Sequence, residues 1–210
     1  ITFLITKLDP EKAHQVTLFA LKLGFHPRLK KVKIRTKINN LIFSNLLGVA
    51  AGFDKNAQII KKIHHLNFGF MEVGTITPLP QYGNPKPRVF RLEKDQAIIN
   101  RNGFNNLGMI EAKKKLECYR KDFPVGGSFV LGINIGPNKD SKDRFDDYET
   151  LSKNLSEFSD YISINISSPN TPNLMDFHES KKLERVLVAV KNGILQSKKA
   201  NIKLPIFLKI

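Results

Sequence analysis

From about Leu46 onward the sequence alternates short apolar runs with segments of helical periodicity, and this alternation limits the chain to few folds. Five runs rich in strand-forming residues lie at 47–53, 70–77, 129–136, 161–167 and 205–210. Helical patterns lie between them at 57–66, 106–120, 148–158 and 181–195. Apolar strands separated by helices predict a parallel sheet with helices outside it. An open doubly wound sheet and a barrel both fit this order.

Residues 89–100 interrupt the alternation and predict a short β-excursion with Asp95 at its turn. Neither GxGxxG nor GxxxxGK[ST] occurs, which counts against a dinucleotide-binding or P-loop nucleotide site.

A helix is predicted before the alternating region, begun by Asp9 and Pro10 and ended by Gly24. Its apolar stripe recurs at i, i+3, i+4 and i+7, through Val16, Phe19, Ala20 and Leu23. Taken from the residues alone, this stripe predicts a helix that packs on the core. The alternative is a helix that lies against lipid or lines a hydrophobic entrance.

Polar residues gather where the fourth apolar run ends, in Ile164-Asn-Ile-Ser-Ser-Pro-Asn-Thr-Pro-Asn-Leu174. Asn165 and Asn170 flank two serines, and Pro169 cannot continue a strand ladder. Such clusters at the ends of buried strands often form sites. The string by itself fits a polar turn equally well.

Three further strings accompany it: Leu47-Gly-Val-Ala-Ala-Gly-Phe-Asp-Lys55, Val73-Gly-Thr-Ile-Thr-Pro78 and Ile98-Ile-Asn-Arg-Asn-Gly-Phe-Asn-Asn106. Together these motifs resemble the class 2 dihydroorotate dehydrogenases, the quinone-linked flavoenzymes of pyrimidine synthesis, from about Leu4 to Ile210. The resemblance implies a (β/α)8 TIM barrel, incomplete here with about five of eight strands and preceded by a small helical segment. It divides the chain into an N-terminal helical extension at 1–40, a possible membrane and quinone-entry region, and a flavin-binding barrel at 41–210 that we expect to be truncated at its C-terminal side.

The implied reaction is oxidation of (S)-dihydroorotate to orotate, with hydride transfer to FMN, Ser168 as the base, and reoxidation of FMN by a membrane quinone. A serine hydroxyl is a weak base and must pass its proton onward. Ser167 is the neighbouring candidate, but the alignment favours Ser168. The resemblance implies cofactor contacts at Ala51, Gly52, Phe53, Asp54, Lys55, Thr75, Asn134, Asn165 and Lys209. It implies substrate contacts at Lys55, Asn100, Arg101, Asn102, Gly103, Phe104, Asn165 and Asn170.

The formal net charge of +15 leaves room for other partners, because it suits nucleic acid or anionic lipid as well as a lysine-rich background. A basic cluster stands out at Arg28, Lys30, Lys31, Lys33, Arg35 and Lys37. No aromatics interleave with it, so we expect no nucleic-acid partner, and membrane attraction is plausible for the cluster. The expected location is the periphery of a membrane, on the cytoplasmic side of a bacterial inner membrane or at a mitochondrial inner membrane in a eukaryote.

Two alternatives remain open from the sequence. One is an RNA-acting flavin barrel resembling the dihydrouridine synthases, which use a catalytic cysteine in a loop. The single cysteine, Cys118, falls in a predicted helix and disfavours it. The other is a non-catalytic remnant unable to hold flavin. His64 and His65 are adjacent, which does not suit one metal on a helix face, and no metal site is expected.

Overall fold

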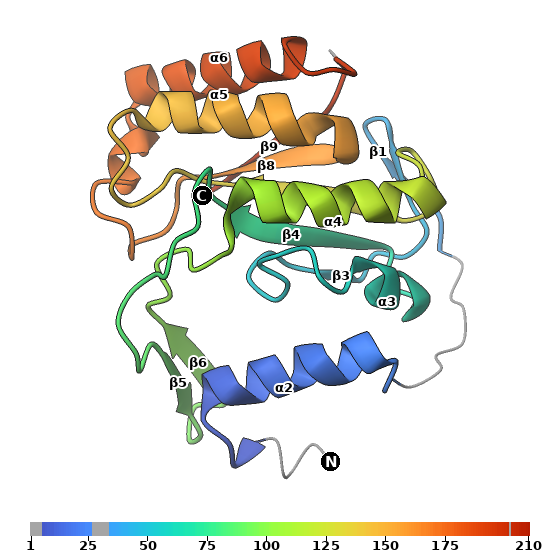
Figure 1. Ribbon diagram of the computed structural model, residues 1–210, viewed down its shortest axis with the longest axis vertical. Coiled ribbons are helices and arrows are strands. Elements are labelled where there is room, and N and C mark those ends of the chain that lie inside the picture. Colours follow the sequence, from blue (N-terminus) through green and yellow to red (C-terminus); the bar gives the residue numbers. More distant parts are fainter. Residues whose placement is uncertain (1–5, 27–33, 202) are drawn as a thin grey trace.

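The computed structural model describes residues 6–26, 34–201 and 203–210. A five-stranded parallel sheet lies at its centre, in the order β3-β4-β7-β8-β9 (Figure 1). The strands are β3 (Gly48–Val49), β4 (Phe70–Ile76), β7 (Val130–Ile135), β8 (Tyr161–Asn165) and β9 (Ile206–Lys209). The five strands lie side by side in chain order, with β3 and β9 at the edges of the sheet. This is the expected incomplete (β/α)8 barrel.

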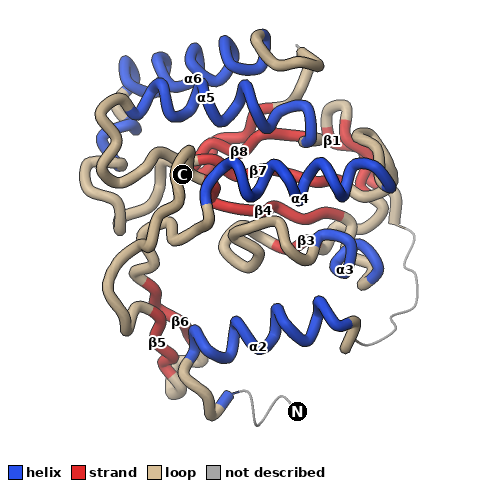
Figure 2. Tube along the Cα trace, in the orientation of Figure 1, coloured by secondary structure: helices blue, strands red, loops and turns tan. Residues whose placement is uncertain are grey.

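Helices connect the strands and lie together on one side of the sheet (Figure 2). They are α3 (Ile60–His65), α4 (Gly108–Asp122), α5 (Arg144–Leu155) and α6 (Ser180–Leu195), with the short 3-10 helices η1 (Ser156–Phe158) and η2 (Met175–His178). Every predicted strand and helix of the alternating region is present. Cys118 lies in α4 and is exposed, as the helical pattern predicted.

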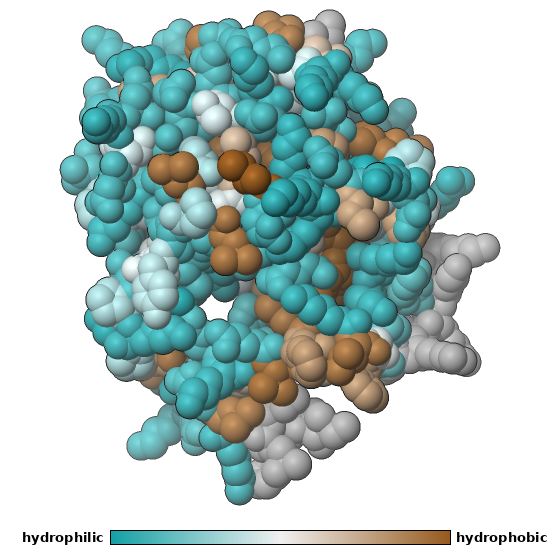
Figure 3. Space-filling view, viewed as in Figure 1, coloured by the Kyte–Doolittle hydropathy of each residue, from teal (hydrophilic) through white to brown (hydrophobic). Residues whose placement is uncertain are grey.

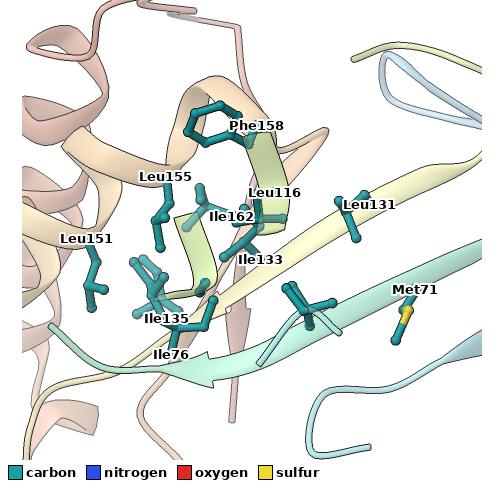
Figure 4. Close-up of a cluster of buried hydrophobic side chains, with 14 of the residues drawn as sticks. Met71, Ile76, Leu116, Leu131, Ile133, Ile135, Leu151, Leu155, Phe158 and Ile162 are labelled. Atoms are coloured by element: carbon teal, nitrogen blue, oxygen red, sulfur yellow. The ribbon is translucent and has the colours of Figure 1, made fainter. Parts of the chain in front are cut away.

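Alternate strand residues face opposite sides of the sheet, because the side-chain period of a strand is two. Met71, Val73, Leu131, Ile133 and Ile162 face the helices and are fully buried. Figure 4 shows how this core continues into Leu116 of α4, Leu151 and Leu155 of α5, and Phe158 of η1. The helical face of the sheet therefore supplies most of the apolar burial that holds the fold.

The opposite face of the sheet is the inside of the barrel, and its chemistry is mixed. Polar residues face inward in its middle and at its carboxyl end, among them Asn134, Ser163 and Asn165, which are all buried. The amino end is apolar. There a hairpin of β1 (Thr36–Ile38) and β2 (Leu41–Phe43), not predicted from the sequence, packs Leu41 and Phe43 against Val130 and Tyr161. The hairpin thus covers one end of the barrel interior.

Within the basic cluster, Arg28, Lys30, Lys31 and Lys33 lie outside the described residues. Lys37 lies in β1 and is exposed.

The N-terminal helix α2 (Pro10–Leu23) has the predicted ends. The Asp9 carboxylate accepts the backbone N–H groups of Glu11 and Lys12, and Gly24 adopts a left-handed conformation with φ of 87°. Such a conformation favours glycine because no Cβ obstructs it. A second hairpin, β5 (Val89–Leu92) and β6 (Ala97–Asn100), confirms the predicted excursion and lies beside α2 (Figure 1).

The packing predicted for α2 is confirmed only in part, because Leu18 belongs to the main core and Leu21 packs against it. Val16, Phe19 and Leu23 are 46%, 63% and 59% exposed, whereas only Ala13 and Leu18 are buried. The predicted stripe therefore lies on a side of the helix that does not meet the core. Hydrophobic side chains gather over α2 at the lower edge of Figure 3. The alternative, a helix facing lipid or an apolar entrance, stays a prediction for this segment.

Among the described residues, no helix combines the length and the apolar character that crossing a bilayer requires.

Candidate active site at the carboxyl edge of the sheet

The candidate residues come from different strands but converge, because parallel strands end at the same edge of the sheet. This edge lies at the left of Figure 1, where the arrowhead of β4 points and the chain reaches its C marker. Thr75 lies near the end of β4, Asn134 near the end of β7, and Asn165 and Lys209 at the ends of β8 and β9.

Three of these side chains form a buried hydrogen-bonded cluster. Thr75 Oγ1 donates to Asn134 Oδ1 at 2.6 Å, and Asn165 Nδ2 donates to Thr75 Oγ1 at 2.9 Å. A longer contact of 3.3 Å joins Asn165 Nδ2 to Asn134 Oδ1. We call Thr75, Asn134 and Asn165 the amide cluster. Buried amides satisfied by one another hold fixed orientations, which suits recognition of a ring with fixed donors and acceptors.

The two serines after β8 have different hydrogen bonds. Ser167 directs both its backbone N–H and its hydroxyl to Asn165 Oδ1, at 3.2 and 3.3 Å. Ser168 Oγ accepts the backbone N–H of Asn170 at 3.3 Å. Within the part of the chain that the structure describes, the Ser168 hydroxyl proton has no acceptor. Ser168 is therefore the serine that is free to exchange a proton with a ligand.

The loop after β3 is tied to β4 through its backbone. Gly52 N donates to Gly74 O at 2.8 Å, and Gly74 N donates to Asp54 O at 3.0 Å. Gly52 has a φ of 102°, and no atom lies within 4 Å of the place where a Cβ would stand. This backbone is open to a flat ligand. Ala51 and Phe53, its neighbours, line the same cavity as Gly52.

Asp54 and Lys55 have separate partners. The buried Asp54 carboxylate accepts the backbone N–H of Ile59 at 2.8 Å and that of Asn56 at 3.3 Å, so it organises the start of α3. Lys55 Nζ donates to Gly52 O at 2.7 Å. Burial lowers the pKa of Lys55, and the charge of Arg88 adds to this effect. Lys55 is half-buried, and its ammonium is held against the backbone of this loop.

The segment from Asn100 to Phe104 reaches the site from β6. Asn100 Oδ1 accepts the N–H groups of Asn102, and Asn170 Nδ2 donates to Asn100 O at 3.4 Å, which joins this segment to the loop after Ser168. Gly103 turns the chain with a φ of 67°.

Phe104 is brought against the amide cluster by the glycine that follows β7. A Cβ on Gly136 would stand 2.7 Å from Thr75 Cγ2 and 3.1 Å from Phe104 Cε2. Only glycine leaves room for the aromatic ring beside Thr75. Arg101 is directed elsewhere, because its guanidinium donates to Pro87 O at 2.9 and 3.1 Å and lies over the Phe90 ring.

Sequence reasoning missed the residues that brace this segment. Gln81 Nε2 donates to Gly103 O at 2.9 Å, and Asn84 Nδ2 donates to Arg101 O at 3.0 Å. It also missed Glu72, on the inner face of β4, whose carboxylate accepts from Asn134 Nδ2 at 2.7 Å. The available signal was a charged residue within a strand that otherwise reads as apolar.

A cavity of about 1080 Å³ extends from this site to α2. Its walls come from the inner side of α2, the loop after β3 and the β5–β6 hairpin, through His14, Leu18, Phe19, Val49, Gly52, Lys55, Val89, Ile98 and Asn100. An opening between α2 and the sheet is visible in Figure 3. The cavity therefore joins an apolar helix to residues of the candidate site.

Two contacts hold α2 over the cavity. His14 Nε2 donates to Phe53 O at 2.6 Å. Glu11 pairs with Arg88 at 2.6 Å, and Arg88 also donates to Tyr82 O at 2.6 Å. Burial alone would raise the pKa of Glu11, but Arg88 and Lys86 lower it overall.

Comparisons with known proteins agree on one family. The profile of the dihydroorotate dehydrogenase family matches residues 33–210. A quinone-dependent dihydroorotate dehydrogenase of Bartonella henselae is 47% identical over 206 residues, which are 97% of this chain and 55% of that protein. The corresponding protein of Sphingopyxis alaskensis is 44% identical over 209 residues, 99% of this chain and 57% of that protein.

A solved dihydroorotate dehydrogenase of Eimeria tenella, in complex with ferulenol, superimposes with a TM-score of 0.88 at 37% identity. The match covers 96% of this chain and 59% of that structure. The chain thus spans somewhat more than half the length of the relatives it matches.

Proposed function

Because the chain belongs to the dihydroorotate dehydrogenase family, we propose that the protein containing it oxidises (S)-dihydroorotate to orotate in pyrimidine biosynthesis, with FMN as its flavin and a membrane quinone as electron acceptor. The observation that carries this proposal is the convergence of an uncommitted serine hydroxyl, a buried amide cluster and two lysines at one edge of the sheet.

The residues present fit a flavin. When bound, a flavin accepts a hydride and later gives up electrons one or two at a time. Its ring edge carries alternating donors and acceptors, toward which the amide cluster would present the remaining lone pair of Thr75. The open backbone at Ala51 and Gly52 leaves room for a flat ring, and Lys209, beside Asn165, would supply a cation that stabilises a reduced, anionic ring.

We assign substrate binding to the side facing Ser168. Dihydroorotate is a cyclic ureide with a carboxylate, so it needs both amides and a cation. Asn100 and Asn170 supply amides from two segments that hydrogen-bond to each other, and Lys55 supplies the cation. Ser168 Oγ then takes the proton from the substrate carbon and releases it to a neighbour or to water.

We assign a structural role to some residues for which the family resemblance implies ligand contacts. Asp54 holds the loop after β3 through backbone hydrogen bonds. Arg101 steadies the β5–β6 hairpin, and Gly103 and Asn102 shape the segment that carries Phe104.

We propose that the cavity beneath α2 admits the quinone, and that the exposed stripe of α2 rests on the membrane surface. Phe19 and Leu23 offer apolar area, and the protein's positive charge favours anionic lipid. This division makes the N-terminal segment, up to residue 40, the membrane-facing part and residues 41–210 the flavin-binding part. The corresponding location is peripheral, on the cytoplasmic side of a bacterial inner membrane or at the mitochondrial inner membrane of a eukaryote.

The test is turnover by protein expressed from its complete reading frame. Orotate should form from dihydroorotate when a soluble quinone analogue is present, and Leu23→Ser, in an exposed residue outside the cavity wall, should weaken binding to anionic vesicles while leaving that turnover intact. A flavin-loaded protein that makes no orotate would contradict the proposed activity. Unchanged vesicle binding in Leu23→Ser would contradict the proposed membrane contact.

The relatives favour this activity over the RNA-acting alternative. Cys118 agrees with them, since it lies on the exposed side of α4 and not in the cavity. Loss of uridine in a transfer RNA substrate would revive the alternative.

A further inference from the structure

Glu72 lies behind the candidate site, on the inner face of β4, and its carboxylate is shared by two donors. Asn134 Nδ2 donates to Glu72 Oε1 at 2.7 Å, and the Tyr161 hydroxyl donates to Glu72 Oε2 at 3.1 Å. Burial, together with the Glu72 charge, raises the pKa of Tyr161, so the phenol keeps its proton and remains a donor. A carboxylate has no proton to give, so both neighbours must turn their N–H or O–H toward it.

This requirement fixes the side-chain amide of Asn134. One proton of Nδ2 goes to Glu72, and the other goes to Ser163 Oγ at 3.2 Å. Oδ1 must therefore face the site, where it accepts from Thr75 Oγ1 at 2.6 Å and from Asn165 Nδ2 at 3.3 Å. Asn134 is fully buried, so a reversed amide would leave a donor facing donors with no water to relieve it.

The orientation of the Asn134 amide also fixes the hydrogen bonds of Thr75 and Asn165, which lie nearer the surface of the site. Thr75 commits its single proton to Asn134 and accepts from Asn165 Nδ2 at 2.9 Å, so toward a ligand it offers only a lone pair. Asn165 turns its carbonyl oxygen toward Ser167, which donates to it twice. One carboxylate thus determines the direction of the hydrogen bonds that run from Asn134 through Thr75 and Asn165 to Ser167.

We propose that Glu72 is a positioning residue that sets the hydrogen-bond polarity of the amide cluster, and that flavin recognition depends on this polarity. The proposal rests on the proposed function only for the identity of the ligand. It names no role for Glu72 in contact with substrate or flavin, because the carboxylate acts through Asn134.

The experiment exchanges the donor and the acceptor. In Asn134→Asp a carboxylate oxygen faces the Glu72 carboxylate across a distance that suits a hydrogen bond, so the two charges repel each other, or the pair takes up one proton at a cost in free energy. Adding Glu72→Gln supplies an amide N–H to one carboxylate oxygen of the new aspartate. The other oxygen of that aspartate still accepts from Thr75. Adding Glu72→Met instead removes the like-charge repulsion but supplies no donor. The comparison between glutamine and methionine thus separates polarity from charge and from packing.

All variants are made in protein expressed from its complete reading frame. Two quantities are measured: the thermal unfolding midpoint without added flavin, and the affinity for FMN from quenching of flavin fluorescence. Asn134→Asp should lower the midpoint and weaken FMN binding by at least about tenfold. Glu72→Gln with Asn134→Asp should recover the midpoint and return FMN affinity to within about threefold of the parent, whereas Glu72→Met with Asn134→Asp should recover neither. Tyr161→Phe, which removes only the second donor to Glu72, should leave FMN affinity within about threefold.

Equal recovery by methionine and glutamine would overturn the proposal, because relief of repulsion would then explain the result. Recovery of the midpoint without recovery of FMN affinity would overturn the role toward flavin, as would a parent protein that binds no FMN. A parent that binds FMN but is not reduced by dihydroorotate would contradict the proposed function and leave the assignment of Glu72 standing.

Discussion

Asn165 and Lys209 are direct partners in the parallel pair of β8 and β9, so their side chains stand next to each other on the inner face of the sheet. Asn165 belongs to the amide cluster, and Lys209 therefore adds a positive charge beside it. Lys209 ends the edge strand β9 and is exposed, so its ammonium is open to an anionic ligand.

Replacing that lysine should affect the flavin. Lys209→Ala should weaken flavin retention or slow flavin reduction, because a cation near the amide cluster favours the reduced, anionic ring. Flavin content after gel filtration and the rate of reduction measure the two effects. The matched control is Lys203→Ala, an exposed lysine of the preceding loop. A Lys209→Ala protein that keeps its flavin and reduces it at the parent rate would remove Lys209 from the site.

The two adjacent serines allow a second test. Ser168→Ala should slow flavin reduction by dihydroorotate by about 10²–10⁴-fold, the usual contribution of a general base, with flavin still bound. Ser167→Ala should slow it far less, because the Ser167 hydroxyl donates to Asn165 Oδ1. Rapid-mixing spectroscopy of flavin bleaching measures both. If the larger loss occurs in Ser167→Ala, the base has been assigned to the wrong serine.

Gly136 should tolerate no side chain. A methyl group there would stand 2.7 Å from Thr75 Cγ2 and 3.1 Å from Phe104 Cε2, so it would displace the ring or the threonine. Gly136→Ala should destabilise the protein by about 1–3 kcal/mol, as overpacking of a filled site does. Flavin affinity should fall with it. Gly127→Ala, in the exposed loop before β7, is the control. Denaturant unfolding of the two variants gives the comparison, and equal stabilities would show that the site is not tightly filled at Gly136.

Acid should loosen α2 through His14. Burial, with the nearby charge of Lys55, lowers the pKa of His14 below its ordinary value of 6.5, although the hydrogen bond to Phe53 O opposes the shift. The unfolded or detached segment therefore binds a proton more readily than the attached one. The stability that His14 contributes is present above pH 6.5, is lost as the pH falls below that value, and levels off below the lowered pKa.

Hydrogen exchange in α2 should consequently speed up between about pH 8 and about pH 5.5, after correction for intrinsic exchange. His14→Gln keeps a donor for Phe53 O but cannot titrate in this range. Its corrected exchange should not change with pH. The same acid response in parent and variant would exclude His14 as the cause.

Much of the fold could be predicted because local and periodic signals agree. The ends of α2 follow from Asp9, Pro10 and Gly24, each of which stabilises a terminus by itself. The strands β4, β7 and β8 are buried on both faces and read as apolar runs. The first predicted strand, 47–53, shortens to Gly48–Val49, because the chain then turns to tie Gly52 and Asp54 to β4.

Other features depend on contacts between distant residues. The strands of the β1–β2 hairpin are too short to show a detectable alternation of apolar and polar residues. The hairpin turns at Asn39, which has a φ of 51°. The apolar stripe of α2 has the same periodicity whether it meets a core, a cavity or lipid, so its exposure could not be read from spacing. The contact of Phe104 with Gly136 and the bond from Glu72 to Asn134 join segments brought together only by the sheet.

The most direct measurement is anaerobic mixing of dihydroorotate with flavin-loaded protein expressed from its complete reading frame. The visible absorbance of the oxidised flavin should disappear, orotate should form in an amount equal to the flavin reduced, and a quinone should restore the absorbance. A flavin-loaded protein whose absorbance does not change on mixing with dihydroorotate would contradict the assignment of this site to dihydroorotate oxidation.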